Sequence, residues 1–382
     1  MQNKKEKWQI KNLGDIATFI NGKAFKPSDW SEVGLPIIRI QNLTNSFGDI
    51  HYYSGEIEDK YLITTGDILI SWSATIDIFE WLNGDAVLNQ HIFKVVFDKE
   101  PIDKTFFKFL IKQKIAEMLK NVHGSTMKHI TKGDFDNIKV LLPPIEEQKK
   151  IANILNKADE IRQKKKLANE KLDEFLKSTF IDMFGNPVKN EKNLPLVKFS
   201  DMGTLARGKS KYRPRNAPEL LGGKYPLIQT GNIANAGLYL RKYTQTYSEL
   251  GLKQSKMWEA GTLCITIAAN IAKTAIMTFD ACFPDSVVGF INNDKCNTQY
   301  IQFWLMFLQS VLEAEAPQSA QKNINLEILN DLSLPYPPLE KQNQFSLIVE
   351  KVETHKQKNE QVIEQMNNLF NSLSQKAFKG EI

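Results

Sequence analysis

Two long charged segments with the same entry motif constrain this fold more than any other feature of the chain. The first begins at the hexapeptide PPIEEQ (residues 143–148) and ends at Gly185. Proline favours the first helical turn, acidic side chains stabilise the positive N-terminal end of a helix, and glycine favours its C-terminal cap. The sequence therefore predicts one long helix over residues 143–185.

Apolar or small residues recur within this segment at alternating spacings of three and four. They are Ile151, Ile154, Ala158, Ile161, Ala168, Leu172, Phe175 and Thr179, with one polar break at Lys165. This spacing predicts a single stripe of the kind found in coiled coils. A helix of about forty residues spans roughly 60 Å, which is too long for one small domain to cover. A partner helix is therefore expected.

The partner is predicted in the same chain. The hexapeptide PPLEKQ (residues 337–342) repeats PPIEEQ 194 residues later, from Pro144 to Pro338. Matching stripe positions follow it, namely Phe345, Ile348, Val352, Val362, Met366, Leu369 and Leu373, and Asn359 takes the place of Lys165. Two unrelated amphipathic helices are the alternative, but the shared motif favours a duplication, with the second long helix in residues 337–382.

The rest of the chain repeats as well. LGDIATFINGK from Leu13 is echoed by FSDMGTLARGK from Phe199, and LPIIRIQNL from Leu35 is echoed by YPLIQTGNI from Tyr225. TGDILIS and GSTMKHIT also have later counterparts, AGTLCIT and QSAQKNIN, in the same order. Four matches in one order predict two similar domains. We place them at residues 1–142 and 196–336, with a polar linker at 186–195.

Secondary-structure signals in the first domain are mixed. Residues 36–41, 67–72 and 92–97 are typical of strands, and residues 105–120 have helical periodicity. The predicted class is α+β, with two similar domains joined by a long two-helix coiled coil. Because the second domain connects the end of one helix to the start of the other, the two helices are expected to be antiparallel.

Composition limits the function classes. The 382 residues are 42% hydrophobic, carry a formal net charge of +5, and include three cysteines without a paired spacing. A globular, mildly basic protein of the reducing cytoplasm is indicated, without a disulfide framework or a zinc ribbon. No apolar run is long enough for a membrane span, and a nucleic-acid partner is permitted but not required.

The strongest basic stretch is ARGKSKYRPRN, in which no acidic residue intervenes. Its cations are Arg207, Lys209, Lys211, Arg213 and Arg215, and the first domain has Lys23, Lys26 and Arg39 in the corresponding neighbourhood. Such clusters are typical of phosphate contacts, although an ordinary solvated loop is the alternative.

Polar residues at two further places are candidates for contacts with DNA. Base readers need forked donors and acceptors, which Arg39, Gln41 and Asn42 offer at the end of one predicted strand and Gln229 and Asn232 at the end of its duplicate. Ser125, Lys128, Ser319 and Lys322 lie in the polar segment before each long helix and are candidates for sugar or phosphate contacts. Solvation or helix capping is the alternative for each.

Catalytic and metal-binding motifs are absent from the sequence: it lacks G-x-S-x-G, a P-loop and H-E-x-x-H. No catalytic residue and no metal ligand is therefore predicted. Two other function classes stay open on these residues, a coiled-coil adaptor that binds only proteins, and a DNA methyltransferase or nuclease whose catalytic part has an unfamiliar sequence.

The motifs together resemble the specificity subunit of type I restriction-modification systems over nearly the whole chain. The resemblance is carried by the LGDIATFINGK-type opening, PIIRIQNL, TGDILIS, GSTMKHIT, LPPIEEQKKIANIL with its second copy PPLEKQ, and the C-terminal LFNSLSQKAFKGEI. It implies two target-recognition domains that each read one half of a bipartite DNA sequence, and two helices that set the gap.

The resemblance also implies partners and cofactors. Two methyltransferase subunits would supply adenine methylation from S-adenosylmethionine. Two restriction subunits, where present, would supply ATP- and Mg²⁺-dependent translocation and cleavage. The subunit itself would be non-catalytic and would hold no cofactor.

Overall fold

The chain is divided between two compact units, each of which takes half of both long helices. The computed structural model describes residues 8–44, 49–120, 131–268, 271–315 and 324–381. Unit 1 comprises residues 1–166 and 360–382, and unit 2 comprises residues 167–359. Each unit is therefore built from segments that are distant in the sequence.

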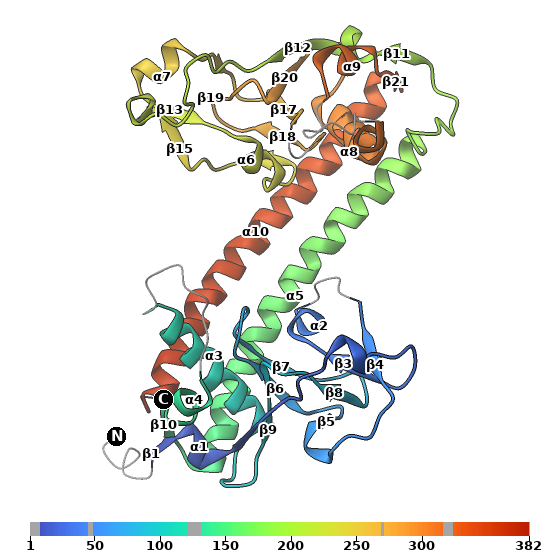
Figure 1. Ribbon diagram of the computed structural model, residues 1–382. Helices are drawn as coiled ribbons and strands as arrows, with labels where there is room; N and C mark the ends of the chain where they lie inside the picture. The colour runs from blue at the N-terminus through green and yellow to red at the C-terminus, as the bar shows by residue number, and fades with distance from the viewer. Residues whose placement is uncertain (1–7, 45–48, 121–130, 269–270, 316–323, 382) are drawn as a thin grey trace. The chain divides into compact units, whose positions relative to one another are not determined.

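Unit 1 opens with short strands and ends with helices (Figure 1). Its elements are β1 (Gln9–Asn12), α1 (Leu13–Ile16), β2 (Thr18–Asn21), the 3-10 helix η2 (Pro27–Asp29), β3 (Leu35–Ile38), α2 (Ile40–Leu43), β4 (His51–Tyr53), η3 (Asp59–Tyr61), β5 (Leu62–Ile63), β6 (Ile68–Ser71), β7 (Asp77–Glu80), β8 (Ala86–Leu88), β9 (Ile92–Val96), α3 (Lys104–Lys120), α4 (Lys132–Asp136), β10 (Lys139–Leu142) and the start of α5 (Ile145–Phe184).

Unit 2 has a closely similar succession of elements after α5. They are β11 (Leu196–Lys198), η4 (Phe199–Met202), β12 (Gly203–Arg207), η5 (Pro218–Leu220), β13 (Leu221–Leu227), α6 (Thr230–Ala234), β14 (Tyr239–Leu240), β15 (Gln245–Tyr247), α7 (Glu249–Lys253), β16 (Met257–Trp258), β17 (Leu263–Thr266), β18 (Thr274–Met277), β19 (Ala281–Cys282), β20 (Val287–Asn292), α8 (Thr298–Glu315), α9 (Leu326–Asp331), β21 (Ser333–Pro335) and α10 (Leu339–Phe378), which ends in unit 1.

Sheet topology confirms the predicted duplication. Unit 1 has sheets of order β2-β9-β6-β7 and β4-β3-β8-β5, and unit 2 has β12-β20-β17-β18 and β15-β13-β19-β16, with β14 added at the edge of its first sheet. The pairs β3–β8 and β13–β19 are parallel in the second sheet of each unit. The α+β class and the two-domain architecture are therefore as expected.

A buried glutamine explains why the entry motif of the long helices is repeated. In α5, Gln148 Oε1 accepts from the backbone N–H of Asp103 (2.9 Å) and Nε2 donates to the carbonyl of Pro143 (2.9 Å). In α10, Gln342 makes the same bonds to Asn297 N–H and Pro337 O, each 2.9 Å. Buried amides need such partners, so each glutamine fixes the start of its helix against the segment before α3 or α8.

The helices run antiparallel within each unit. In unit 1, the guanidinium of Arg162 donates to Asn367 Oδ1 (3.2 Å), and Ala152 shares a core with Ala377. In unit 2, Asn359 Nδ2 donates to Asn169 Oδ1 (2.8 Å), and Phe184 packs against Phe345. Higher numbers on α5 meet lower numbers on α10 in each case, as predicted.

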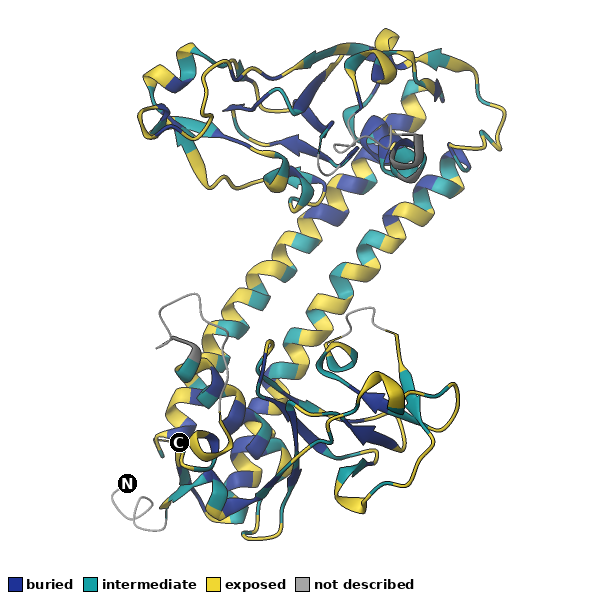
Figure 2. Ribbon diagram, viewed as in Figure 1, coloured by how far each residue is buried: buried dark blue, intermediate teal, exposed yellow. Residues whose placement is uncertain are grey.

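The predicted apolar stripe is wrong at four positions. Ile154, Ile161, Phe175 and Leu369 are 45–51% exposed, whereas the adjacent Leu155 and Leu176 are fully buried. Figure 2 shows exposed residues recurring along both helices. Near the middle of the helices, the residues that contact the partner helix are largely polar. They are Arg162, Asn169 and Asp173 on α5, with their partners Asn367, Asn359 and Lys356 on α10. The spacing of apolar residues therefore predicts the wrong contact face there.

One predicted strand is also too long. Residues 36–41 were expected to be extended, but β3 ends at Ile38 and the chain enters helix α2 at Ile40. The strands expected over 67–72 and 92–97 correspond to β6 and β9, and the helix expected over 105–120 corresponds to α3. Among the described residues, no helix combines the length and the apolar character that crossing a membrane requires.

Candidate nucleic-acid interface

In both units a Gly-Lys pair lies where the chain crosses close to the backbone of another segment, a feature that we call the Gly-Lys crossing. At Gly208 a Cβ would lie 2.2 Å from the carbonyl oxygen of Phe283, and at Gly22 it would lie 2.1 Å from that of Asn89. No side chain fits at such distances. The following residues, Lys209 and Lys23, donate their backbone N–H groups across the same crossing, to Phe283 O (3.2 Å) and Leu88 O (2.9 Å).

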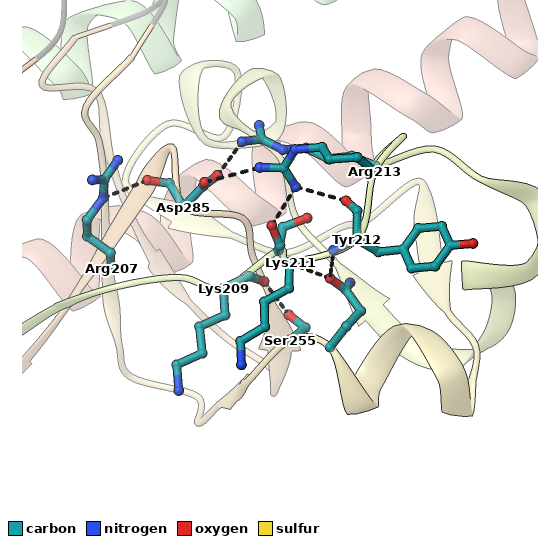
Figure 3. A network of polar contacts seen from close by, with 10 residues as sticks. Arg207, Lys209, Lys211, Tyr212, Arg213, Ser255 and Asp285 are labelled. Carbon is teal, nitrogen blue, oxygen red and sulfur yellow. Dashed lines mark hydrogen bonds and ion pairs between the residues drawn. The ribbon is translucent and has the colours of Figure 1, made fainter.

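In unit 2 this crossing begins the basic loop, which we define as residues 207–215. The sequence of the loop contains no acid, but folding brings Asp285 against it, as Figure 3 shows. Arg215 lies 2.6 Å from Asp285 Oδ1 and Arg213 lies 3.6 Å from Oδ2. Arg207 Nε donates to the backbone carbonyl of the same aspartate (2.9 Å). The carboxylate of Asp285 therefore offsets much of the repulsion between Arg213 and Arg215.

The two lysines of the basic loop differ from its arginines. Both are exposed, and within the described part of the chain no hydrogen bond or ion pair involves the ammonium groups of Lys209 or Lys211, which point away from Asp285 (Figure 3). Their backbone is nevertheless held, because Gln254 Oε1 accepts from Lys211 N–H (2.7 Å) and Ser255 Oγ donates to Lys209 O (2.8 Å). Free cations on a fixed backbone suit contact with phosphates.

Unit 1 presents fewer free cations at the corresponding place. Lys23 Nζ donates to the hydroxyl of Tyr53 (3.1 Å) and lies 4.7 Å from the centre of that ring. Lys26 is exposed, and its backbone N–H donates to Asp29 Oδ2 (2.7 Å). The first domain therefore presents a weaker basic surface at this place than the second.

The candidate base readers lie at strand-to-helix junctions. Arg39 and Gln229 precede α2 and α6 with extended backbones, while Gln41, Asn42 and Asn232 lie inside these short helices instead of at strand ends. The side-chain oxygen of each asparagine caps its own helix: Asn42 Oδ1 accepts from Arg39 N–H (3.0 Å) and Asn232 Oδ1 from Gln229 N–H (2.9 Å). The side-chain oxygens of both asparagines therefore take part in helix capping, the alternative expected for these residues.

A cleft of about 240 Å³ brings two candidate regions of unit 2 together. Its lining includes Gln229 and Thr230 at the start of α6, Ser210 and Arg215 of the basic loop, and Ser286. The predicted phosphate-contacting loop and the predicted reader are therefore neighbours, although they are distant in sequence. In contrast, Ser125, Lys128, Ser319 and Lys322 lie outside the described residues.

Residues that the sequence did not single out hold these candidates in place. Asp285, Gln254 and Ser255 fix the basic loop, and Trp30 and Gln245 contact Arg39 and Gln229. No local sequence motif identifies these residues, because each contacts a residue that is distant in the sequence. The separations range from 9 residues (Trp30 to Arg39) to 78 residues (Arg207 to Asp285). Within the described ranges, no group of three or more His, Cys, Asp or Glu side chains could hold a metal ion.

Comparison with known proteins identifies one family. The model described as the type I restriction modification DNA specificity domain matches residues 5–172 and 191–365. The type I restriction enzyme EcoBI specificity subunit of Escherichia coli is 22% identical over 413 residues, covering 99% of this chain and 86% of that protein. The putative MjaX specificity subunit of Methanocaldococcus jannaschii is also 22% identical, over 404 residues, covering 96% and 93%.

Solved structures have a similar fold. The S subunit of a type I restriction-modification system from M. genitalium aligns with a TM-score of 0.58 at 13% identity, covering 97% of this chain and 96% of that one. A chain from a structure concerned with assembly and conformational transition of a type I R-M system aligns with a TM-score of 0.56 at 17% identity, covering 98% of both. These alignments extend over both domains and both helices.

Proposed function

Since the chain belongs to the type I restriction-modification DNA specificity family, we propose that it is the non-catalytic subunit that selects the DNA sequence for a type I complex. Each domain reads one half of a bipartite target in this proposal. The observation that carries it is the repeated sheet order, which gives one chain two recognition domains of the same architecture. Two similar readers suit a duplex target with two half-sites.

The surface chemistry supports a DNA partner. Lys209 and Lys211 present ammonium groups that the loop itself does not neutralise, and phosphate contacts of this kind position a protein on the duplex without reading its sequence. Lys23, Lys26, Arg207, Arg213 and Arg215 are proposed as further backbone contacts, with the arginines held in place by Asp285. Sequence would be read by the residues at the strand-to-helix junctions.

Catalysis is proposed to reside in partner subunits. The relatives are named as specificity subunits of type I restriction enzymes, and on that basis this chain would assemble with two methyltransferase subunits and, in a restricting complex, two restriction subunits. S-adenosylmethionine, ATP and Mg²⁺ would be bound by those partners. No observation favours a protein-only adaptor or a catalytic role for this chain over DNA recognition.

Selection of targets from a randomised duplex pool tests the proposal. The complex of this chain with its methyltransferase partner should enrich two short sequences separated by a gap of constant length. Enrichment of one continuous sequence would contradict the bipartite model, and retention without any enrichment would leave only a non-specific DNA-binding role. Filter binding to random duplex across a salt series distinguishes either kind of DNA-binding protein from a protein-only adaptor, because the adaptor would give no salt-dependent retention of DNA.

A second experiment tests the proposed role of the helices in setting the gap. One heptad inserted into α5 and one into α10 lengthen each helix by roughly 10 Å. This corresponds to at most about three base pairs at 3.4 Å each. The added base pairs also rotate one half-site about the DNA axis relative to the other, and this mismatch should reduce affinity. The half-sites should keep their bases while the gap grows by about one to three base pairs. An unchanged gap with altered half-sites would contradict this role.

A further inference from the structure

Arg39 and Gln229 occupy the same position in the two domains. Their backbones have nearly identical dihedral angles, φ −112° and ψ 167° for Arg39 and φ −118° and ψ 168° for Gln229. Each precedes a short helix and donates its N–H to an asparagine three residues later. The backbone is thus the same in both copies while the side chain differs, as expected of a position that gives each copy a different specificity.

The guanidinium of Arg39 is held by an aromatic side chain. It lies 4.8 Å from the centre of the Trp30 ring, which contacts the ring of His51. Within the described ranges, no hydrogen bond or ion pair involves the Arg39 guanidinium. A cation–π contact with a ring uses none of the N–H groups of the guanidinium as hydrogen-bond donors to a polar partner, so they stay available for a planar acceptor pair. Guanine N7 and O6 form such a pair in the major groove.

Gln229 is held in a comparable way by a polar neighbour. Its Nε2 donates to the side-chain oxygen of Gln245, which lies on β15 opposite Leu227 of β13. One N–H of Nε2 has a partner in this arrangement, so the second N–H and Oε1 can serve a ligand. A glutamine amide with a free donor and acceptor matches adenine, whose major-groove edge offers the N7 acceptor and the N6 donor.

A second, independent observation supports a ligand site beside Gln229. Ser210 is 6% exposed and its Oγ has no hydrogen-bond partner among the residues that the structure describes, yet it lines the same 240 Å³ cleft as Gln229. A buried hydroxyl without a partner is unfavourable unless a ligand or solvent satisfies it. Arg215 lines this cleft as well, but Asp285 neutralises its charge. A neutral base edge therefore suits this place better than a phosphate.

We propose that Arg39 and Gln229 are the matched specificity-determining residues of the two domains, Arg39 reading a guanine in one half-site and Gln229 reading an adenine in the other. Asn42 and Asn232 are assigned to capping, and the lysines to the phosphates. The inference rests on the proposed function, because it requires that each domain reads its own half-site.

Reciprocal substitutions test this assignment in the complex with the methyltransferase partner. Target selection with Arg39→Gln should replace one guanine by adenine in one half-site and leave the other half-site unchanged. Gln229→Arg should replace one adenine by guanine in the other half-site only. Each preference should shift by roughly 5- to 150-fold, the range expected for one bidentate base contact. Thermal melting of each variant shows whether its domain is folded.

Two controls separate base reading from other roles. Lys26→Gln removes one positive charge from the same domain and should weaken binding to all duplexes without changing a base. Wild-type protein on a target with 7-deazaguanine or 7-deazaadenine at the assigned position should bind roughly 2- to 12-fold more weakly, because one of the two hydrogen bonds of the bidentate contact is lost, and this result does not depend on the folding of a variant.

The outcomes distinguish this inference from the proposed function. If Arg39→Gln or Gln229→Arg lowers affinity uniformly and both half-sites keep their bases, the specificity assignment is overturned while the two-domain reader stands. The same holds if neither deaza-purine weakens binding. If the wild-type complex enriches no half-site, the proposed function itself fails.

Discussion

The ammonium group of Lys356 on α10 lies 2.6 Å from Oδ1 of Asp173 on α5. Its symmetric counterpart in the other unit is the pair Arg162 and Asn367, since both partners differ by 194 in number (162 to 356, 173 to 367). In each unit the cation also contacts an acid three residues earlier, Glu353 or Asp159. The duplication therefore extends to the polar contacts between the helices.

Removal of one partner from this pair should destabilise unit 2. Lys356 has a side-chain exposure of 13%, whereas that of Asp173 is 48%, so solvent screens part of the interaction. We expect Asp173→Ala to lower the free energy of unfolding by about 1 kcal/mol, because Glu353 still accompanies the lysine. Urea denaturation measures the change. The exposed neighbouring variant Glu174→Ala is the control, and an equal loss in both would refute the role of the pair.

The same lysine predicts a pH dependence. Burial lowers the pKa of Lys356, but the hydrogen bond to Asp173 and the charge of Glu353 outweigh it, so the pKa is raised above its ordinary value. Arg241, which donates to Glu353 Oε2 (3.3 Å), is a further charge at this site, and Lys177 and Lys273 line the same cleft as Lys356 and Asp173. A raised lysine pKa contributes stability that is fully present below about pH 10.4, the value in the unfolded chain, and is lost as pH rises through the folded-state pKa.

Comparison of variants isolates this effect. The stability difference between wild type and Lys356→Met should be constant below about pH 10 and should shrink above it. Other groups that titrate in alkali, such as Tyr300, whose pKa is raised by burial, are common to both proteins. Lys358→Met, at an exposed position of the same helix, should show no such trend. A pH-independent difference for Lys356→Met would argue against a charge effect.

The lysines of the basic loop should contribute more to DNA binding than its arginines. Lys209→Ala with Lys211→Ala should weaken binding to all duplexes and reduce the slope of log K against log salt by about two, since each lost phosphate contact changes it by about 0.9. Arg213→Ala with Arg215→Ala should reduce the slope less, because Asp285 already neutralises these arginines. Filter binding across a salt series compares the two. A larger reduction of the slope in the arginine variant than in the lysine variant would mean that the arginines leave Asp285 when DNA binds.

The Gly-Lys crossings predict that substitution of two glycines is not tolerated. Gly22→Ala and Gly208→Ala would each force a Cβ to within 2.1–2.2 Å of a backbone oxygen, so each domain should lose about 2 kcal/mol or more and its loop should be displaced. Gly133→Ala and Gly231→Ala are matched helix controls, because their Cβ atoms would meet nothing closer than 4.0 Å. These should be neutral or slightly stabilising. Equal melting temperatures for all four variants would contradict the steric role of Gly22 and Gly208.

Much of the architecture could be predicted from the sequence, because it is encoded in local patterns that occur twice. PPIEEQ and PPLEKQ predict two long helices, and the domain that connects them predicts that they are antiparallel. The Gly-Lys pairs lie in repeated segments of the sequence, but only the structure shows that the backbone passes close to another segment at each pair. The register of the helices was less accessible. Apolar periodicity favoured Ile154, Ile161 and Phe175, whereas the structure turns these outward and pairs polar side chains across the contact.

Only the tertiary structure decided how the candidate site is organised. The sequence alone established two copies, their basic stretches and the residue types able to contact DNA. It contains no local sign that Asp285 neutralises two arginines of the basic loop, that Asn42 and Asn232 are capping residues, or that Trp30 and Gln245 hold Arg39 and Gln229. Local patterns follow from the backbone periodicity of helices and strands, whereas the partner of a polar side chain depends on which distant segments the sheets bring together.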